Sequence, residues 1–218
     1  MKIKYLGTAA AEGIPAIFCE CETCKRAAAL GGRNIRTRSQ AIIDDTLLID
    51  FPADTYMHYL KWGVPINKIK ACIITHSHAD HLYPLEIEMR KRGFSHLEDD
   101  APLVFYSDES GYNALNSVVK DYNISKDDVR PVKIEPFKSF ETRGYTVTPV
   151  RATHDPASDP VIYAIEKDSK SLLYANDTSE PCEESMDCLK SLGRPFNVIS
   201  LDCTEANRKH RLHRPYEP

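Results

Sequence analysis

The chain carries, from residue 71 to residue 81, the sequence Ala71-Cys72-Ile73-Ile74-Thr75-His76-Ser77-His78-Ala79-Asp80-His81. The first five of these residues are apolar or β-branched without alternation, which is typical of a strand buried on both faces. The six that follow hold three imidazoles and a carboxylate, a density far above the composition of the chain. The stretch therefore predicts a chemical site where a buried strand ends.

These polar residues are suited to binding metal ions. Imidazole nitrogen and carboxylate oxygen are good ligands for divalent ions such as zinc and manganese. Because a loop points alternate residues to different sides of a small cavity, His76 and His78 can bind one ion while Asp80 and His81 bind another. The alternative is a polar loop whose histidines only cap a strand and a helix, but one loop seldom needs three imidazoles for capping.

Two ions need more ligands than one loop supplies, and two later segments offer them. His154 follows a predicted strand that ends near Arg151, and Asp177 follows the apolar run 171–175. A single His or Asp after a strand is more often a turn residue. Together with the loop at 76–81, however, these two residues form a plausible ligand set.

The rest of the chain alternates between strand and helix patterns. We expect strands at 2–6, 39–43, 46–50, 71–75, 102–106, 131–135, 145–151, 161–166, 171–175 and 197–201, and helices at 22–30, after Pro52, and at 82–91, 109–121 and 180–191. Helices recur between strands in both halves, which predicts a layered α/β architecture with mixed sheets rather than a doubly wound parallel sheet. We expect His58 to be a surface or second-layer residue and Arg90-Lys91-Arg92 to be a solvated helix end.

Length and charge narrow the class of protein. The chain has 218 residues, with 28 basic and 32 acidic side chains. This balance argues against nucleic acid as a partner. No apolar run approaches the roughly 18 residues of a membrane span, and the first residues lack a signal-peptide apolar block. We therefore expect one cytoplasmic domain with no membrane partner; the oligomeric state stays open, with a homodimer as one option.

Three of the seven cysteines form a cluster: Cys19, Cys21 and Cys24 fall within six positions. In a reducing compartment such a cluster favours a metal site over a disulfide framework. Three thiolates are one ligand short of the four that structural zinc takes, so a fourth must come from elsewhere or the site is not closed. The alternative is three incidental reduced thiols.

The pattern His76-x-His78-x-Asp80-His81, with His154, Asp177 and the Asp50 that ends Leu48-Ile49-Asp50, resembles the metallo-β-lactamase superfamily. The resemblance covers nearly the whole chain. It implies an α/β (α+β four-layer) fold, the αββα sandwich of two mixed β-sheets flanked by helices, with a dinuclear metal site between the sheets. It also implies how the ligands are shared: His76, His78 and His154 on the first ion, Asp80 and His81 on the second, Asp177 bridging, and Asp50 orienting the ligands from behind.

A second match lies near the amino terminus. The stretch Gly7-Thr8-Ala9-Ala10-Ala11-Glu12-Gly13-Ile14-Pro15, followed by the cysteine cluster, is similar to the signature of one branch of this superfamily. That branch contains the phosphoribosyl 1,2-cyclic phosphate phosphodiesterase of the carbon-phosphorus lyase pathway. It implies a structural zinc bound by the three cysteines and a late histidine. Such an ion would cross-link a loop that has little side-chain bulk to hold itself.

The end of the chain supplies further catalytic candidates. Leu201-Asp202-Cys203-Thr204 resembles a piece of the same branch, in which a downstream histidine assists catalysis. Of His210 and His213 we favour His213 as a general acid, and we count Asp80 with them as catalytic. The alternative is that both histidines are solvated, because Arg and Lys residues surround them.

One departure from the family concerns the last strand. The family ends in a Thr-His-x-x-x-His-like element, where one histidine completes the second metal site and the next closes the structural zinc site. This chain stops at Tyr216-Glu217-Pro218 before such an element. Either the sequence is truncated before this element or two ligands have been lost. Truncation is favoured, because two clusters that otherwise match well are both one ligand short at the same place. We therefore expect a single domain over 1–218 that lacks its last strand.

The resemblance implies a metal-dependent phosphodiesterase with two divalent ions, zinc or manganese, and one structural zinc. The two ions would deprotonate a water to hydroxide for in-line attack on a small cyclic phosphate ester, such as 5-phosphoribosyl 1,2-cyclic phosphate. Two alternatives stay open: another hydrolase on the same scaffold (a tRNA 3'-end endonuclease, a lactonase or a thioesterase) and a non-catalytic zinc-stabilised scaffold. The lack of a long basic insertion and the negative net charge disfavour the tRNA option.

Overall fold

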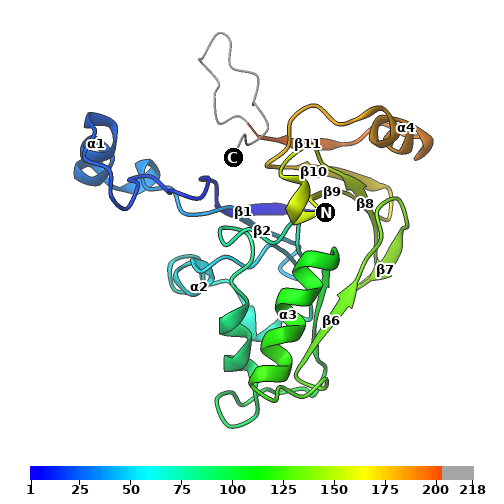
Figure 1. Cartoon of the computed structure of the whole chain (residues 1–218), viewed down its shortest axis with the longest axis horizontal. Helices are drawn as coiled ribbons and strands as arrows, with labels where there is room; N and C mark the ends of the chain where they lie inside the picture. Colours follow the sequence, from blue (N-terminus) through cyan, green and yellow to red (C-terminus); the bar gives the residue numbers. More distant parts are fainter. Residues whose placement is uncertain (203–218) are drawn as a thin grey trace.

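Two β-sheets packed face to face form the body of the protein in a computed structural model that describes residues 1–202 (Figure 1). The first sheet has the strand order β1 (Ile3–Gly7), β2 (Gln40–Ile43), β3 (Leu47–Ile49), β4 (Ala71–Ile73), β5 (Leu103–Ser107) and β6 (Val129–Lys133). The second has the order β11 (Val198–Leu201), β10 (Lys170–Ala175), β9 (Val161–Lys167), β8 (Tyr145–Arg151) and β7 (Phe140–Thr142). Both sheets are mixed, with parallel pairing from β3 to β6 and between β10 and β11.

The core follows from the alternation of side chains along these strands. In β4, Ala71 and Ile73 point into the space between the sheets, whereas Cys72 points to the outer face of the first sheet. In β9, Tyr163 points inward and Ile162 outward. Because both faces of these strands are covered, apolar residues occupy consecutive positions, which explains the unbroken apolar run at 71–74.

Helices cover the two outer faces. Helix α3 (Glu109–Asp121) and the 3-10 helix Pro84–Arg90 pack on the first sheet, beside α2 (Thr55–Trp62). Helix α4 (Glu183–Ser191) packs on the second sheet. Helix α1 (Glu22–Leu30), with the cysteine loop that precedes it, projects away from the sandwich (Figure 1). Three further 3-10 helices lie at Gly32–Asn34, Ile66–Lys68 and Pro156–Ser158. Within residues 1–202, no helix has the length and apolar character needed to cross a membrane.

The structure corrects two expectations and decides a third. The predicted helix at 82–91 is a 3-10 helix of seven residues that begins at Pro84. Arg90, expected in solvent, is buried, and its guanidinium donates hydrogen bonds to the carbonyl oxygens of Asp128 and Ala101. Of the two positions expected for His58, the surface is excluded: the residue is fully buried, and its ring forms hydrogen bonds with Gln40 and Thr37. Both polar side chains are therefore buried with their hydrogen bonds satisfied.

A buried carboxyl at the start of α3 gives the fold a pH dependence. Asp108 Oδ1 accepts a hydrogen bond from the Gly111 amide, while its Oδ2 is buried with no partner among residues 1–202. Burial, together with the nearby charge of Asp159, raises the pKa of Asp108 to about 7. The folded state therefore holds this proton at pH values where the unfolded chain, with a pKa of about 4, has lost it. The stabilisation from Asp108 is complete below about pH 4 and is lost as the pH rises through 7.

We therefore expect Asp108→Asn, which keeps the acceptor for Gly111 without the charge, to raise the melting temperature more at pH 8 than at pH 5. Thermal unfolding of both proteins at the two pH values tests this. The exposed Asp121 at the other end of α3 provides the control Asp121→Asn, for which no such pH-dependent gain is expected. An equal gain for Asp108→Asn at both pH values would contradict the assignment.

Candidate metal centre

The candidate ligands lie where strands of both sheets end at the same edge of the sandwich. His76 comes three residues after β4 in the first sheet. His154 comes three residues after β8, and Asp177 two residues after β10, in the second sheet. The amide of Val161 donates a hydrogen bond of 2.8 Å to the carbonyl oxygen of Thr75 and so ties the two sheets together beside the site. Residues more than 70 positions apart in the sequence thus meet at one point.

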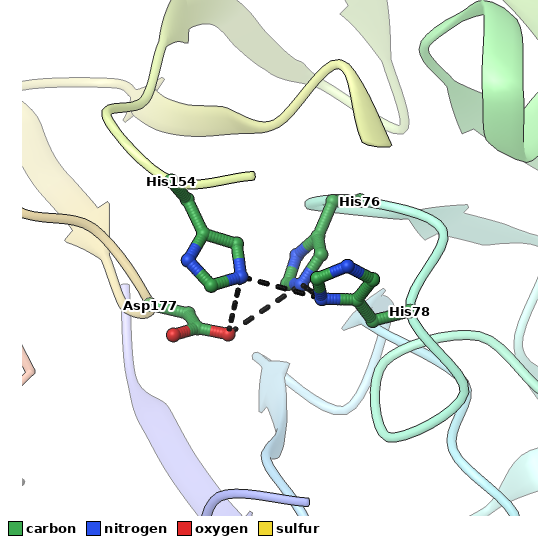
Figure 2. A group of neighbouring side chains, drawn as sticks. All are labelled: His76, His78, His154 and Asp177. Carbon is green, nitrogen blue, oxygen red and sulfur yellow. Dashed lines mark hydrogen bonds and ion pairs between the residues drawn. The ribbon is translucent and has the colours of Figure 1, made fainter. Parts of the chain in front are cut away.

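A first ligand group consists of four side chains that point toward one another: His76, His78, His154 and Asp177 (Figure 2). His78 Nδ1 lies 3.1 Å from His76 Nε2 and 3.2 Å from His154 Nε2. Asp177 Oδ2 lies 3.4 Å from each of the same two Nε2 atoms. Tetrahedral zinc with bonds of about 2.0–2.1 Å separates neighbouring ligand atoms by about 3.3–3.4 Å. The spacing and the donor types of this group therefore fit a divalent ion.

A second ligand group consists of Asp80, His81 and Asp177. His81 Nε2 lies 3.4 Å from Asp80 Oδ2 and 3.4 Å from Asp177 Oδ2. The Asp177 oxygen that belongs to the first group therefore belongs to the second as well. This group also fits a divalent ion, with a single carboxylate between the two positions.

Asp50 holds the second group from behind. Its Oδ2 accepts a hydrogen bond of 2.8 Å from His81 Nδ1, which leaves Nε2 of that ring to act as a ligand. Its Oδ1 accepts from the amide and the hydroxyl of Thr75, at 2.8 and 2.9 Å. A carboxylate behind a histidine fixes the tautomer and the orientation of the ring. Asp50 thus lies directly behind His81, on the side of the ring away from Nε2.

Two of the aspartates in the site have left-handed backbone conformations. The φ angle is 65° at Asp50 and 56° at Asp177. Such values are uncommon outside glycine, although Asp tolerates them better than most residues. Strained backbone of this kind tends to cluster at functional sites, where the surrounding structure maintains it.

The charges of the site suit cation binding. Burial and the neighbouring His81 lower the pKa of His76 to about 2, so its ring is neutral at pH 7. Burial acts against ionisation of Asp177, but the hydrogen bond from His81 and the nearby imidazoles lower the pKa of Asp177 to about 2. Burial also acts against a charge on His81, yet the carboxylates of Asp50, Asp177 and Asp80 raise its pKa well above the usual value. The carboxylates around His81 therefore favour a positive charge at this place, which a bound cation would supply instead of the proton on the ring.

Asp155 is a site residue that the sequence-based prediction missed. Its Oδ2 lies 3.1 Å from His78 Nε2, and its Oδ1 accepts a hydrogen bond from the Ala157 amide. It therefore stands behind His78 as Asp50 stands behind His81. The one available signal was its position directly after His154, because the contact with His78 spans 77 positions of sequence.

We expect both Asp155→Ala and Asp155→Asn to weaken metal binding by about 10–100-fold. Alanine removes the acceptor for His78 Nε2. Asparagine can still accept from the Ala157 amide, but its amide group then faces His78 Nε2 and favours the tautomer that carries its proton on Nδ1, the ligand atom. Competition with a chelator measures the affinity, and melting of the metal-free variants serves as the control for folding. Wild-type affinity in Asp155→Asn would rule out this role.

The cysteine cluster forms a separate candidate metal site beside helix α1. The Sγ atoms of Cys19, Cys21 and Cys24 lie within 4.8 Å of one another. Hydrogen bonds from the Cys24 amide and from the neighbouring thiols lower the pKa of Cys21 to about 7, which favours the thiolate that binds metal. Residues 1–202 bring no fourth ligand to this group. The catalytic candidates His210 and His213 lie outside the described residues.

A cavity of about 400 Å³ adjoins the second ligand group, and His81 and Asp177 are part of its lining. Its size falls in the range of small-molecule sites, about 300–1,000 Å³. Side chains from both sheets line it, among them Tyr5 of β1 and Ser200 of β11. The candidate metal centre is thus open to a ligand of small-molecule size.

Comparisons with known proteins concern the family and the fold of the chain. A family described as "Anti-Pycsar protein Apyc1" matches residues 39–218. The fold is similar to a crystal structure described as a new diphosphatase from the PhnP family, with a TM-score of 0.67 and 25% sequence identity over 90% of this chain and 72% of that one. It is also similar to Zn²⁺-bound PqqB from Methylobacterium extorquens, with a TM-score of 0.71 and 21% identity over 93% and 72% of the two chains. The short form of human tRNase Z has a TM-score of 0.64 and 16% identity over 91% and 76%. No curated protein matches the chain in sequence.

Proposed function

The chain belongs to the family of the anti-Pycsar protein Apyc1 and has the αββα metallo-β-lactamase sandwich, and on that premise we propose that it is a metal-dependent phosphodiesterase that opens a small cyclic phosphate ester. One observation carries the proposal: two ligand groups share a single oxygen of Asp177 at the wall of a cavity. Two adjacent divalent ions are a recurrent arrangement for phosphoryl transfer.

The cofactors of this proposal are two divalent ions, zinc or manganese, in the site and one structural zinc at the cysteine cluster. His76, His78 and His154 would hold the first ion, Asp80 and His81 the second, with Asp177 between them. When bound, such ions lower the pKa of water to supply a nucleophile near pH 7 and neutralise phosphoryl oxygens. The similarity to Zn²⁺-bound PqqB concerns the fold alone, and donors of this kind accept zinc and manganese alike.

The chain's own residues contribute position and protonation state. Asp50 and Asp155 keep the protons of His81 and His78 on the nitrogens that face away from the ligand positions. His76 stays neutral because it is buried. A leaving alkoxide needs a proton, and we propose His213 as its donor, with His210 as the second candidate. Asp80, in the second ligand group, is the third residue that we propose as catalytic.

A small ester with two phosphate groups is the substrate that best suits this proposal, for example 5-phosphoribosyl 1,2-cyclic phosphate. The amino-terminal stretch 7–15 resembles the branch that acts on this compound. The structural relative at 25% identity is described as a diphosphatase of the PhnP family. The cavity of about 400 Å³ accommodates a small molecule.

Phosphorus NMR tests the proposal directly. The full chain is reconstituted with zinc or manganese and incubated with ribosyl 1,2-cyclic phosphate esters and with a panel of cyclic ribonucleotides. Conversion of any of these to an acyclic monoester, abolished by a chelator, is the expected result. Unchanged spectra for all of them, with metal analysis showing the ions bound, would overturn it. A thioester and a lactone are the control substrates, and turnover of these alone would point to another hydrolase.

A further inference from the structure

The cavity beside the second ligand group has two kinds of wall. One is the sandwich itself, where His81, Asn176 and Asp177 mark the metal side. The other is the amino-terminal loop between Thr8 and Ile14, together with Arg36. A substrate whose ester lies at the metal positions therefore extends its remaining part toward this loop and Arg36.

The backbone of Arg36 is held in place, whereas its side chain has no hydrogen-bond or ion-pair partner among residues 1–202. Two hydrogen bonds with Ile14, at 2.8 and 2.9 Å between amide nitrogen and carbonyl oxygen, hold its backbone in place. The side chain is exposed, and no carboxylate among residues 1–202 forms an ion pair with it. An exposed guanidinium is well suited to bidentate binding of a phosphate group.

The neighbouring arginines differ from Arg36 in this respect. The guanidinium of Arg38 already has partners, because it donates to the Ala11 carbonyl oxygen and forms an ion pair with Asp54. Arg33 lines a second cavity, which Arg36 also borders, but it does not line the cavity next to the metal centre. Among residues 1–202, Arg36 is the one cationic side chain of the Lys and Arg type that lines the cavity next to the metal centre.

The acidic residues of the cavity restrict where an anion can bind. Glu12 and Asp202 also line it. Like-charge repulsion from the Glu12 carboxylate disfavours a negative group on that part of the rim, so Arg36 is the favoured place for a second anionic group of the ligand. The charges therefore favour a ligand with one negative group at the metal positions and another at Arg36.

We propose that Arg36 binds a second phosphate group of the substrate, remote from the ester that is hydrolysed, and so selects cyclic esters that carry such a group. This inference rests on the proposed function of the site and adds a residue that determines specificity. Because Arg36 contacts the part of the substrate that does not react, its contribution is to binding of that group. The effect of its removal should therefore appear mainly in KM and only for substrates with the second phosphate.

The test compares 5-phosphoribosyl 1,2-cyclic phosphate with ribose 1,2-cyclic phosphate, which lacks the second phosphate. We expect wild-type protein to prefer the first compound in kcat/KM and Arg36→Gln to lose about tenfold to hundredfold of that preference. Arg33→Gln, an exposed arginine of the same segment, is the matched control and should keep the wild-type preference. Equal losses on both compounds in Arg36→Gln, or a wild-type protein without preference, would overturn the proposal.

A binding measurement separates this inference from the proposed function. Calorimetry of ribose 5-phosphate with chelator-treated protein needs no turnover and no bound ion. Weaker binding of ribose 5-phosphate to Arg36→Gln than to wild type and Arg33→Gln supports the phosphate site. This result would stand even if neither ester were hydrolysed, and then only the proposed function would fail. Equal binding by all three proteins, or no binding to any of them, counts against Arg36.

Discussion

Replacing Asp177 by alanine is expected to lower hydrolysis of a cyclic phosphate ester by more than about 100-fold, since loss of a group behind a ligand already costs about 10–100-fold. Asp177 Oδ2 lies 3.4 Å from the Nε2 atoms of His76, His81 and His154. Its removal takes one ligand from both groups at once and also removes the negative charge between three imidazoles. Both activity and metal content should therefore fall.

The measurement is the initial rate at saturating substrate, together with the number of ions bound per chain. Asp168→Ala is the matched control, because Asp168 is an exposed turn aspartate whose φ angle of 54° is also left-handed. It reproduces the backbone effect of the substitution without touching the site, and its activity and metal content should equal those of wild type. Full activity with two ions bound in Asp177→Ala would refute the shared-ligand assignment.

Replacing Gly7 by alanine is expected to destabilise the protein by about 3 kcal/mol or more, at the upper end of the range for overpacking. A Cβ atom at this position would lie 1.9 Å from the Arg38 carbonyl oxygen and 2.8 Å from the Thr37 carbonyl oxygen. Both are backbone atoms, so no side-chain rotation relieves the clash. β1 would have to move away from the segment 37–39 that precedes β2. Because Arg36 comes directly before this segment, its position would change as well.

Denaturant unfolding compares Gly7→Ala with wild type and with Gly32→Ala. At Gly32 the φ angle is 56° and a Cβ atom would meet nothing within 4 Å, so this control has the strain of a left-handed alanine without a clash, about 1–2 kcal/mol. If Gly7→Ala unfolded at the same denaturant concentration as Gly32→Ala, the close approach of β1 to residues 37 and 38 would be wrong.

Most of the secondary structure follows from local sequence. Helix 109–121 and strand 145–151 occur within the predicted bounds, because the helix has an apolar face with an aspartate cap and the strand is bounded by turn residues. The sequence predicts a helix at 82–91 but not its 3-10 form over Pro84–Arg90, and it does not predict the three-residue strand β7. Both are short, so tertiary contacts decide their conformation, as with the buried Arg90.

The candidate ligands could be identified for a different reason. Chemically distinctive residues directly after predicted strands mark the edge at which those strands end, so His76, His154 and Asp177 could be grouped without knowledge of the pairing. The partners behind the ligands are harder to identify, since Asp155 reaches His78 only after two loops from different sheets meet. Burial of His58 likewise depends on Gln40, which lies on a neighbouring strand.

The division of the candidate ligands between the two sheets would make metal affinity and sheet packing thermodynamically reciprocal. His76, His78, Asp80 and His81 follow strands of the first sheet, whereas His154 and Asp177 follow strands of the second. The hydroxyl of Tyr163 in the second sheet donates to the Ile74 carbonyl oxygen, two residues before the first ligand. A core substitution that lets one sheet slide against the other would therefore appear as weaker metal binding, and bound ions would resist that shear in return.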